Sequence, residues 1–220
     1  EAEITGDAFD FNPILSNANN ATLANSRYGD NHRFIGVASK SWSYGSNKKW
    51  STTVSSFYEL AKGGRFNYTY AGDINNDGSN LNDLIYIPTT SEISQMQFGN
   101  TNDASNLDNF IKQDAYLKGR RGQYAERYAA LAPWRAKMDV KFIQNLKLKN
   151  NNSLEFSIDV LNFGNLLNSD WGLVQQPDAV QPIGVTVAAN GTPTYSFNSG
   201  LKETFVYNSS LISRWQMQFG

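Results

Sequence analysis

The chain contains no cysteine and only one histidine, His32, among its 220 residues. The absence of thiols excludes disulfide bonds and thiolate metal sites. A single imidazole excludes any catalytic or metal site that needs two histidines from this chain. Because no constellation of nucleophile, acid and base stands out, we expect a protein that is not an enzyme.

Charge is also scarce. The formal net charge is -1, so no basic surface points to a nucleic-acid partner. Charged residues make up 18% of the chain, below the usual quarter, while aromatic residues reach 13%. Such a composition, rich in asparagine, serine and glycine as well, is typical of many strands joined by long polar loops.

Long apolar runs are missing too. No segment approaches the roughly 18 residues of a membrane-spanning helix. This does not exclude membrane-spanning strands, which carry apolar residues only at alternate positions. The first residues, "EAEITGDAFDFN", lack the basic start and apolar centre of a signal peptide. We therefore expect either that a signal peptide was removed or that the chain begins within a longer protein.

The clearest pattern present is strict alternation over residues 132–165. In both halves one set of alternate residues is apolar, and the set between them is charged or polar. The apolar set comprises Trp134, Ala136, Met138, Val140, Phe142, Leu154, Phe156, Ile158 and Val160. The other set includes Arg135, Lys137, Asp139, Lys141, Ser153, Glu155, Ser157 and Asp159. The pattern predicts a long hairpin with one apolar and one charged face, and charge pairing across it.

The same reasoning predicts the other elements. Strands are expected at about 32–43, 48–61, 134–147, 151–165 and 203–219, with tight turns at 43–48 and 148–152. Ser105 is expected to cap a short helix that ends at Gly119. Its buried face would comprise Leu107, Phe110, Ile111 and Ala115.

Long polar segments, about 1–31, 72–131 and 166–202, all fall at one end of such an up-and-down sheet. Loops of this length are uncommon in compact soluble domains but expected on the extracellular side of outer-membrane barrels. The predicted strands, with about 12–16 residues, exceed the usual five or six and are long enough to cross a bilayer at a tilt.

These observations predict an all-β fold, an antiparallel up-and-down transmembrane β-barrel segment with long extracellular loops. Its five or six strands are too few for closure, which takes at least eight, so the remainder of the barrel must come from elsewhere. The alternative is a soluble β-sandwich module that binds carbohydrate or protein, with tryptophan and tyrosine side chains stacking on sugars.

One candidate metal site is the segment "DINNDG". Asp73, Asn75 and Asp77 occupy positions one, three and five of a calcium-loop pattern, and glycine follows at position six. Position twelve is Leu84 rather than an acid, and Asp83 comes one residue early. The sequence therefore leaves two interpretations, a calcium loop or a turn in which the side chains accept backbone N–H groups.

A candidate ligand site lies in "KGRRGQYAERY". Arg120, Arg121, Tyr124 and Arg127 would form a patch that grips an anionic or sugar ligand at the extracellular mouth. The alternative is that these residues are solvated and pair with acidic neighbours such as Asp114 and Glu126.

Four segments carry a resemblance to a known family: "YAGDINNDGSNLNDLIYIP", "RGQYAERYAALAPW", "LNFGNLLNSDWG" and "SRWQMQFG". Together they resemble the C-terminal barrel strands of TonB-dependent outer-membrane receptors of the Bacteroidetes type, close to the Oar-like branch beside the SusC-like one. The resemblance covers most of residues 26–220.

The resemblance implies a 22-stranded barrel in the Gram-negative outer membrane, with an N-terminal plug domain absent from this stretch. It implies import of a glycan, peptide or chelate with energy from TonB. The expected partners are the remainder of the barrel and plug, the TonB complex through an N-terminal part, outer-membrane lipid and a surface lipoprotein, but no nucleic acid. Segments 72–131 and 166–202 would be extracellular and both tight turns periplasmic. No cofactor other than calcium is expected.

Overall fold

A computed structural model describes residues 9–15, 23–29 and 32–220. The chain divides into two compact units, which are described separately. Unit 1 comprises Glu1–Gly29, Gly64–Ala132 and Pro177–Val206, and unit 2 comprises Asp30–Gly63, Pro133–Gln176 and Tyr207–Gly220. The structure is mainly strand, with mostly antiparallel sheets and few helices, so the chain is all-β in class. Part of the loop expected at 1–31 lies outside the described residues.

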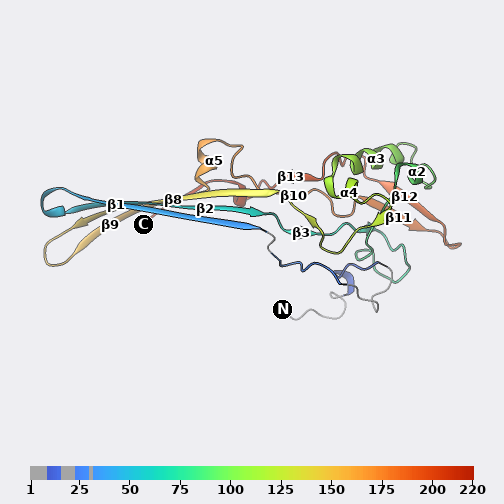
Figure 1. Cartoon of the computed structure of the whole chain (residues 1–220), viewed down its shortest axis with the longest axis horizontal. Helices are drawn as coiled ribbons and strands as arrows, with labels where there is room; N and C mark the ends of the chain where they lie inside the picture. The colour runs from blue at the N-terminus through green and yellow to red at the C-terminus, as the bar shows by residue number, and fades with distance from the viewer. Residues whose placement is uncertain (1–8, 16–22, 30–31) are drawn as a thin grey trace. The chain divides into compact units, whose positions relative to one another are not determined.

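Unit 2 is built on a five-stranded antiparallel sheet in the order β1-β2-β8-β9-β14. The strands are β1 (Arg33–Tyr44), β2 (Trp50–Lys62), β8 (Trp134–Lys147), β9 (Ser153–Leu161) and β14 (Gln216–Phe219). Figure 1 shows β1, β2, β8 and β9 as long neighbouring strands whose two hairpin turns lie at the same end. The first turn contains a short 3-10 helix, η1 (Ser46–Lys48). The alternating segment 134–147 therefore forms a strand with the predicted bounds.

Asparagine residues end the regular strands. Asn150 and Asn151 adopt positive φ in the tight turn between β8 and β9, a conformation that asparagine tolerates better than most residues. The strand expected to continue to 165 stops at Leu161 because Asn162 is left-handed, with φ 53°. Asn162 Nδ2 donates to the Gly172 carbonyl at 3.1 Å, and α5 (Phe163–Leu167) follows in place of a strand.

The strand expected at 203–219 is divided. It forms β13 (Phe205–Tyr207), the 3-10 helix η2 (Leu211–Ser213) and β14. The interruption has a local cause, since Asn208 Oδ1 accepts the N–H of Ser210 at 2.9 Å and turns the chain. Ser213 Oγ then accepts the N–H of Val174 at 3.0 Å, which holds the turn within unit 2. A single uninterrupted final strand is therefore wrong.

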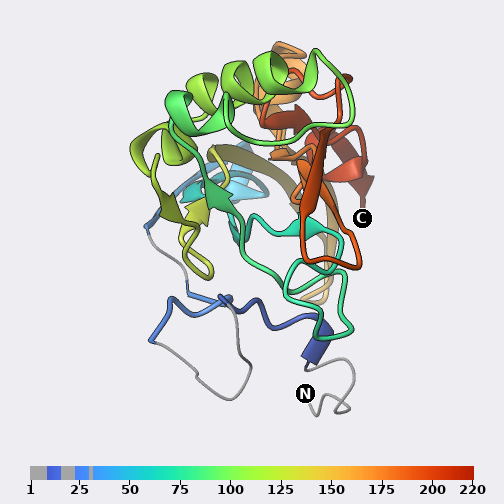
Figure 2. The ribbon, with the colours of Figure 1, turned by 90° about the vertical axis from the view of Figure 1, so that its right-hand side faces the viewer.

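Unit 1 packs three helices with several short strands. The helices are α2 (Thr90–Ile93), α3 (Asp103–Gln113) and α4 (Ala115–Gly119), visible in green in Figure 2. A three-stranded sheet has the order β12-β11-β4, formed by Pro193–Phe197, Ile183–Val187 and Tyr70–Ala71. Two small sheets pair β3 (Arg65–Phe66) with β7 (Ala130–Leu131), and β5 (Tyr86–Ile87) with β6 (Gln123–Tyr124). Strand β10 (Gln175–Pro177) pairs with β13. Segments 72–131 and 166–202 are thus more structured than loops.

These elements enclose a hydrophobic core. Its buried members are Tyr68, Tyr70, Leu84, Ile85, Ile87, Ile93, Leu107, Phe110, Ile111, Leu117, Ala125, Ala130, Ile183, Val185, Phe197 and Leu201. Leu107, Phe110 and Ile111 are buried as the helical periodicity predicts, whereas Ala115 is exposed. The predicted single helix is in fact two, with Asn102 rather than Ser105 at the first N-cap position.

The helix breaks at Asp114 for a reason that lies outside the helix. Asp114 has extended backbone angles, and its Oδ1 accepts the N–H of Leu117 at 2.7 Å. Its Oδ2 accepts the hydroxyls of Tyr68 at 2.9 Å and Thr204 at 2.7 Å. One buried carboxylate thereby joins two of the segments of unit 1, Gly64–Ala132 and Pro177–Val206. Burial, and next the negative charge of Asp114, raises the pKa of Tyr68.

Candidate functional site

One face of the five-stranded sheet in unit 2 is apolar. Directly opposed residues in an antiparallel sheet share a face, and the register Tyr44↔Trp50↔Leu146↔Leu154 therefore defines it across four strands. We call this the apolar face. Its large apolar members are Phe34, Trp42, Tyr44, Trp50, Val54, Tyr58, Leu60, Trp134, Met138, Val140, Phe142, Leu146, Leu154, Phe156, Ile158, Val160, Met217 and Phe219. Lys40, opposite Val54, is its charged exception near the middle.

Aromatic side chains lie toward both ends of the apolar face and are exposed. Beside the first hairpin turn are Trp42 (49% exposed) and Trp50 (39%), and toward the other end are Tyr58 (42%) and Trp134 (44%). Tyr58 is eight positions from Trp50, and Lys62, the partner of Trp134, is twelve. At ~3.3 Å per residue this is roughly 26–40 Å along the strand. A tilt of about 40° reduces it to roughly 20–30 Å, which brackets the apolar band of ~25 Å in transmembrane barrels.

The opposite face of the same sheet is mostly polar. Arg33 Nε and Glu59 Oε1 are 2.7 Å apart, and Lys141 Nζ and Asp159 Oδ2 are 2.9 Å apart. The pairing of Glu155 and Asp159 with Arg135 and Lys137, expected across the hairpin, is wrong in register: Asp159 lies opposite Lys141, Glu155 lies opposite Asn145, and Arg135 is 3.8 Å from Glu59 instead. Serine and threonine hydroxyls pair across strands as well, at 2.9 Å for Ser39 with Ser55. Ile35, Val37 and Phe57 are exposed apolar exceptions on this face.

The predicted calcium ligands lie close together in unit 1. Asn75 Nδ2 donates to Asp83 Oδ1 at 2.6 Å and to Asp77 Oδ2 at 3.0 Å. Both carboxylate oxygens of Asp73 accept backbone N–H groups, from Asp77 at 3.0 Å and from Gly78 at 2.8 Å. Asp83 is buried, and this burial, together with the charges of Asp77 and Asp73, raises its pKa to about 6.

This all-oxygen donor set suits a hard cation such as Ca²⁺. The hydrogen bonds are equally those of the alternative interpretation, a turn capped by its own side chains. Within the described part of the chain, no three acidic or histidine side chains are arranged to hold a metal ion. Calcium binding by Asp73, Asn75, Asp77 and Asp83 therefore stays a prediction.

The four predicted ligand residues have different surroundings. Arg121 is largely buried, with Nη2 2.7 Å from Asp108 Oδ1 and Nη1 donating to the Pro88 carbonyl at 3.0 Å. Arg120 pairs with Glu126 at 3.0 Å, as the alternative interpretation expected for that acid. The exposed Tyr124 ring meets Tyr86 edge to face, with ring centroids 5.2 Å apart. The fourth residue, Arg127, lines a pocket.

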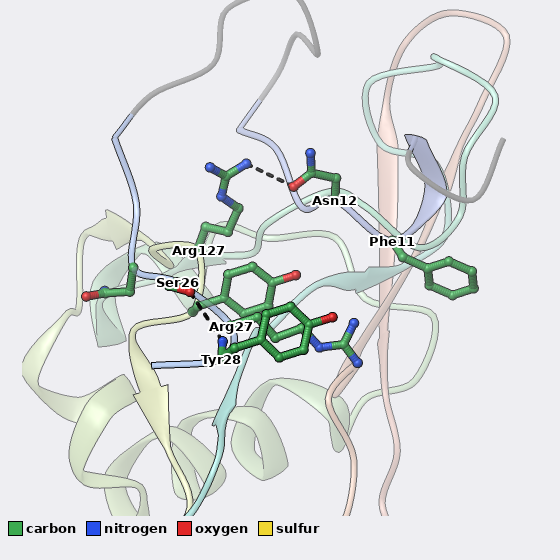
Figure 3. Close-up of a pocket in the computed structure, with 8 residues that line it drawn as sticks. Phe11, Asn12, Ser26, Arg27, Tyr28 and Arg127 are labelled. Carbon is green, nitrogen blue, oxygen red and sulfur yellow. Dashed lines mark hydrogen bonds between the residues drawn. The ribbon is translucent and has the colours of Figure 1, made fainter. Parts of the chain in front are cut away.

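That pocket is a cavity of about 330 Å³ within unit 1. Its lining residues include Phe11, Asn12, Arg27, Tyr28, Arg127 and Tyr128, and Figure 3 shows the Phe11 ring directed away from the other labelled side chains. Arg127 Nη1 donates to Asn12 Oδ1 at 2.9 Å, and in Figure 3 the Tyr28 ring lies below both residues. The Arg27 guanidinium lies 5.9 Å from the centroid of the Tyr28 ring.

Tyr128 holds an uncommon backbone conformation beside this pocket. Its φ is 54°, in the left-handed region that non-glycine residues rarely adopt. Two hydrogen bonds fix it, because Asn67 Oδ1 accepts the N–H of Tyr128 at 2.5 Å and Arg65 Nη1 donates to its carbonyl at 2.7 Å. Such strained positions cluster at ligand sites. The fixed backbone conformation also restrains the direction in which the Tyr128 side chain projects.

No family model, curated protein or solved structure matches this chain. No helix among the described residues is long and apolar enough to cross a membrane. The geometry of the apolar face and of the pocket therefore has to carry the functional argument.

Sequence reasoning placed only Arg127 at the pocket. Asn12 and Arg27 are 115 and 100 residues away from Arg127 and belong to a polar segment without periodicity. No local signal marks such residues as partners, since only the packing of unit 1 brings them together. The positive φ of Tyr128 has no sequence signature either.

Proposed function

We propose that this chain is part of the barrel of an energy-coupled outer-membrane receptor, and that its apolar face contacts lipid. The single observation that carries the proposal is the exposed apolar face with aromatic side chains toward both ends. Transmembrane barrels combine an outward apolar band with aromatic girdles at both interfaces and a polar interior. The polar face of the same sheet, with its ion pairs and hydroxyl pairs, suits a water-filled lumen.

The edges of the sheet support the same proposal. Among the described residues, β1 pairs only with β2, and β14 pairs only with β9. An unpaired strand edge in lipid leaves backbone groups without hydrogen bonds at a cost of several kcal/mol each. In the proposed receptor these edges pair with further strands, and the family resemblance suggests 22 in all.

Connectivity assigns the remaining parts. The tight turns join β1 to β2 and β8 to β9, whereas the connections from β2 to β8 and from β9 to β14 leave the opposite end of the sheet. Unit 1 is made largely from those longer connections. On this proposal unit 1 is extracellular and contacts the ligand or a surface lipoprotein. The plug and the contact with TonB belong to other parts of the polypeptide.

A soluble β-sandwich is the alternative. Sandwiches bury the inner face of each sheet against a second sheet. In unit 2 the described residues form no second sheet of comparable size, and Phe34, Leu154 and Phe219 are each more than 60% exposed on the apolar face. This exposure favours lipid over a sandwich core.

Site-directed fluorescence can test the proposal, because this stretch contains no native cysteine. Val54→Cys places a label on the apolar face, and Ser55→Cys places a label one residue away on the polar face. The intact polypeptide is reconstituted in vesicles and labelled with an environment-sensitive dye. We expect brominated lipid to quench the label at position 54, and aqueous iodide to quench the label at position 55.

The paired design separates the alternatives. Quenching of both labels by iodide, together with recovery of the native polypeptide in the aqueous fraction, would support the soluble module. Quenching of both by lipid would contradict the polar lumen. Only opposite responses at the two adjacent positions agree with a barrel wall.

A further inference from the structure

The pocket in unit 1 has an unusual charge balance. Two guanidinium groups, Arg27 and Arg127, belong to its lining, and none of the described lining residues is acidic. Among the described residues neither arginine forms an ion pair, in contrast to Arg120 and Arg121 nearby in the sequence. Arginine side chains that keep their charge without a carboxylate partner favour an anionic ligand, which they bind through paired N–H groups.

Arg127 is held in position by a hydrogen bond, but most of its N–H donors have no acceptor among the described residues. A guanidinium has five N–H donors, and among the described residues Asn12 Oδ1 is the only acceptor that Arg127 reaches. The bond to Asn12 restrains the side chain, so less conformational entropy is lost when a ligand binds. Arg27 makes no hydrogen bond with the described residues and lies against the Tyr28 ring.

The rest of the lining narrows the ligand class. The other described lining residues have aromatic, amide or hydroxyl side chains, and none of them is aliphatic. Tyr28 is 77% exposed, so the flat face of its ring is available for stacking. Aromatic faces bind the C–H face of a sugar ring, amides bind its hydroxyls, and guanidinium groups bind a carboxylate. A peptide ligand with aliphatic side chains would find no apolar subpocket.

Size limits the occupant. A cavity of about 330 Å³ is near the lower end of the range for small-molecule sites, about 300–1,000 Å³. It suits one or two sugar rings rather than an extended polymer segment. We propose that this pocket binds an acidic sugar, a pyranose ring that carries a carboxylate, with the acid on Arg127 and the ring against Tyr28, which lies below Arg127 in Figure 3.

This inference gives the proposed receptor a substrate class. The role of the acidic sugar as an imported ligand rests on the proposed function. Binding itself is independent of membrane topology. A negative result in the quenching experiment would remove the receptor but leave the pocket, whereas a negative binding result would remove the pocket ligand but leave the barrel.

The test is calorimetric titration of the intact polypeptide, purified in detergent at low salt. The probes are digalacturonic acid, its dimethyl ester, neutral digalactose and the acidic dipeptide Glu-Glu. We expect digalacturonic acid to bind at least about tenfold more tightly than the other three, because the guanidinium–carboxylate bonds exist only for the acidic sugar.

Variants locate the site. Arg127→Gln should weaken binding of the acid about tenfold or more and leave the ester unchanged. Tyr28→Ala should weaken the acid and the ester alike, and Tyr28→Phe should retain both. Arg120→Gln is the matched control, because it removes the same charge from an arginine outside the pocket that pairs with Glu126. It should change affinity less than about twofold.

Three outcomes would overturn the inference. The first is equal binding of the acid and its ester, or no binding of digalacturonic acid at all. The second is preferential binding of Glu-Glu, which would assign the pocket to an acidic peptide. The third is an equal loss of affinity in Arg120→Gln and Arg127→Gln, which would show a general effect of charge.

Discussion

The two units use apolar residues in opposite ways. Unit 1 buries them in a core of helices and short strands, whereas in unit 2 only Ala61 and Val160 are buried among the apolar residues. Both units contain many aromatic and aliphatic side chains, so composition does not separate them. The difference lies in architecture, because a single-layer sheet has no inside of its own. Unit 1 is stabilised by its own packing, and on the proposal above unit 2 is stabilised by lipid against its apolar face.

Two leucine truncations put this comparison to its strongest test. Leu107, 1% exposed in unit 1, and Leu154, 61% exposed on the apolar face of unit 2, can each be replaced by alanine. We expect Leu107→Ala to lower the free energy of unfolding by about 2–5 kcal/mol, since it leaves a cavity in a packed core. Leu154→Ala should cost less than about 1 kcal/mol, because lipid or detergent fills the space. Urea unfolding in detergent, followed by circular dichroism, gives both values.

Equal costs would contradict the comparison. A loss of several kcal/mol in Leu154→Ala would mean that protein covers the apolar face. A small loss in Leu107→Ala would mean that unit 1 relaxes around the gap.

Introduced charge should distinguish the two faces of the sheet nearly as strongly. Val54→Arg places a cation at the middle of the apolar face, and Ser55→Arg places it on the polar face. An arginine at the bilayer midplane destabilises a transmembrane barrel by about 2–4 kcal/mol, so Val54→Arg should fold poorly into vesicles. Ser55→Arg should fold nearly as well as the unchanged protein, measured by the heat-modifiable gel shift of folded barrels. If the two variants fold equally well, the apolar face does not meet lipid.

Acid should weaken unit 1 through Asp108. Burial acts to raise the pKa of Asp108, but hydrogen bonds from Lys112, Arg121 and Thr90 outweigh it and lower that pKa. A carboxyl group with a depressed pKa stabilises the fold above its unfolded value of about 3.9, and this stabilisation is lost as pH falls through the folded value. Asp108→Asn should therefore cost about 1–3 kcal/mol at pH 7 and less at pH 3, below the unfolded pKa, where the stabilisation has begun to be lost.

The control for this pH effect is Glu126→Gln. Its partner Arg120 is the same kind of residue, but the Glu126 side chain is 59% exposed, against 12% for Asp108. Exposed ion pairs contribute about 0–1 kcal/mol, so its loss should be small at both pH values. Thermal unfolding at pH 7 and pH 3 measures both variants. A cost for Asp108→Asn that does not change with pH would assign the effect to packing.

Local periodicity predicted what is local in this molecule. Alternation placed the strand Trp134–Lys147, and helical spacing placed Leu107 and Phe110 in a core. The break at Asp114 could not be predicted from its neighbours, because the carboxylate is held by Tyr68 and Thr204, 46 and 90 residues away.

The same limit applied to the sites. Asp73, Asn75, Asp77 and Asp83 are close in the sequence, so their proximity followed from spacing alone. The ion pair between Arg121 and Asp108 was missed because the two residues are 13 positions apart, with a helix end and a turn between them. The β11–β12 hairpin was missed because its strands have five residues each and β11 pairs in parallel with β4, far earlier in the chain.

The smallest predicted effect concerns calcium at Asp73, Asn75, Asp77 and Asp83. A loop of extracellular affinity, with Kd of about 10⁻⁴–10⁻³ M, would gain roughly 1–2 kcal/mol of stability in 5 mM Ca²⁺ by mass action. We expect the unfolding temperature of the intact protein to rise with Ca²⁺ at pH 7.5 and not with Mg²⁺, which demands a tighter octahedral geometry. The double variant Asp73→Asn, Asp77→Asn should abolish the rise.

The matched control is Asp170→Asn, which removes an exposed acid from unit 2, away from the loop in sequence. It should leave the calcium effect intact, because only the four loop residues supply ligands. If calcium stabilises neither the unchanged protein nor the Asp170→Asn variant, the loop is a turn held by its own hydrogen bonds, such as those from Asn75 to Asp77 and Asp83. If calcium does raise the unfolding temperature, this loop of unit 1 is stabilised by a bound ion rather than by the hydrophobic core. Unit 2 is likewise proposed to be stabilised by something outside its own fold, namely lipid.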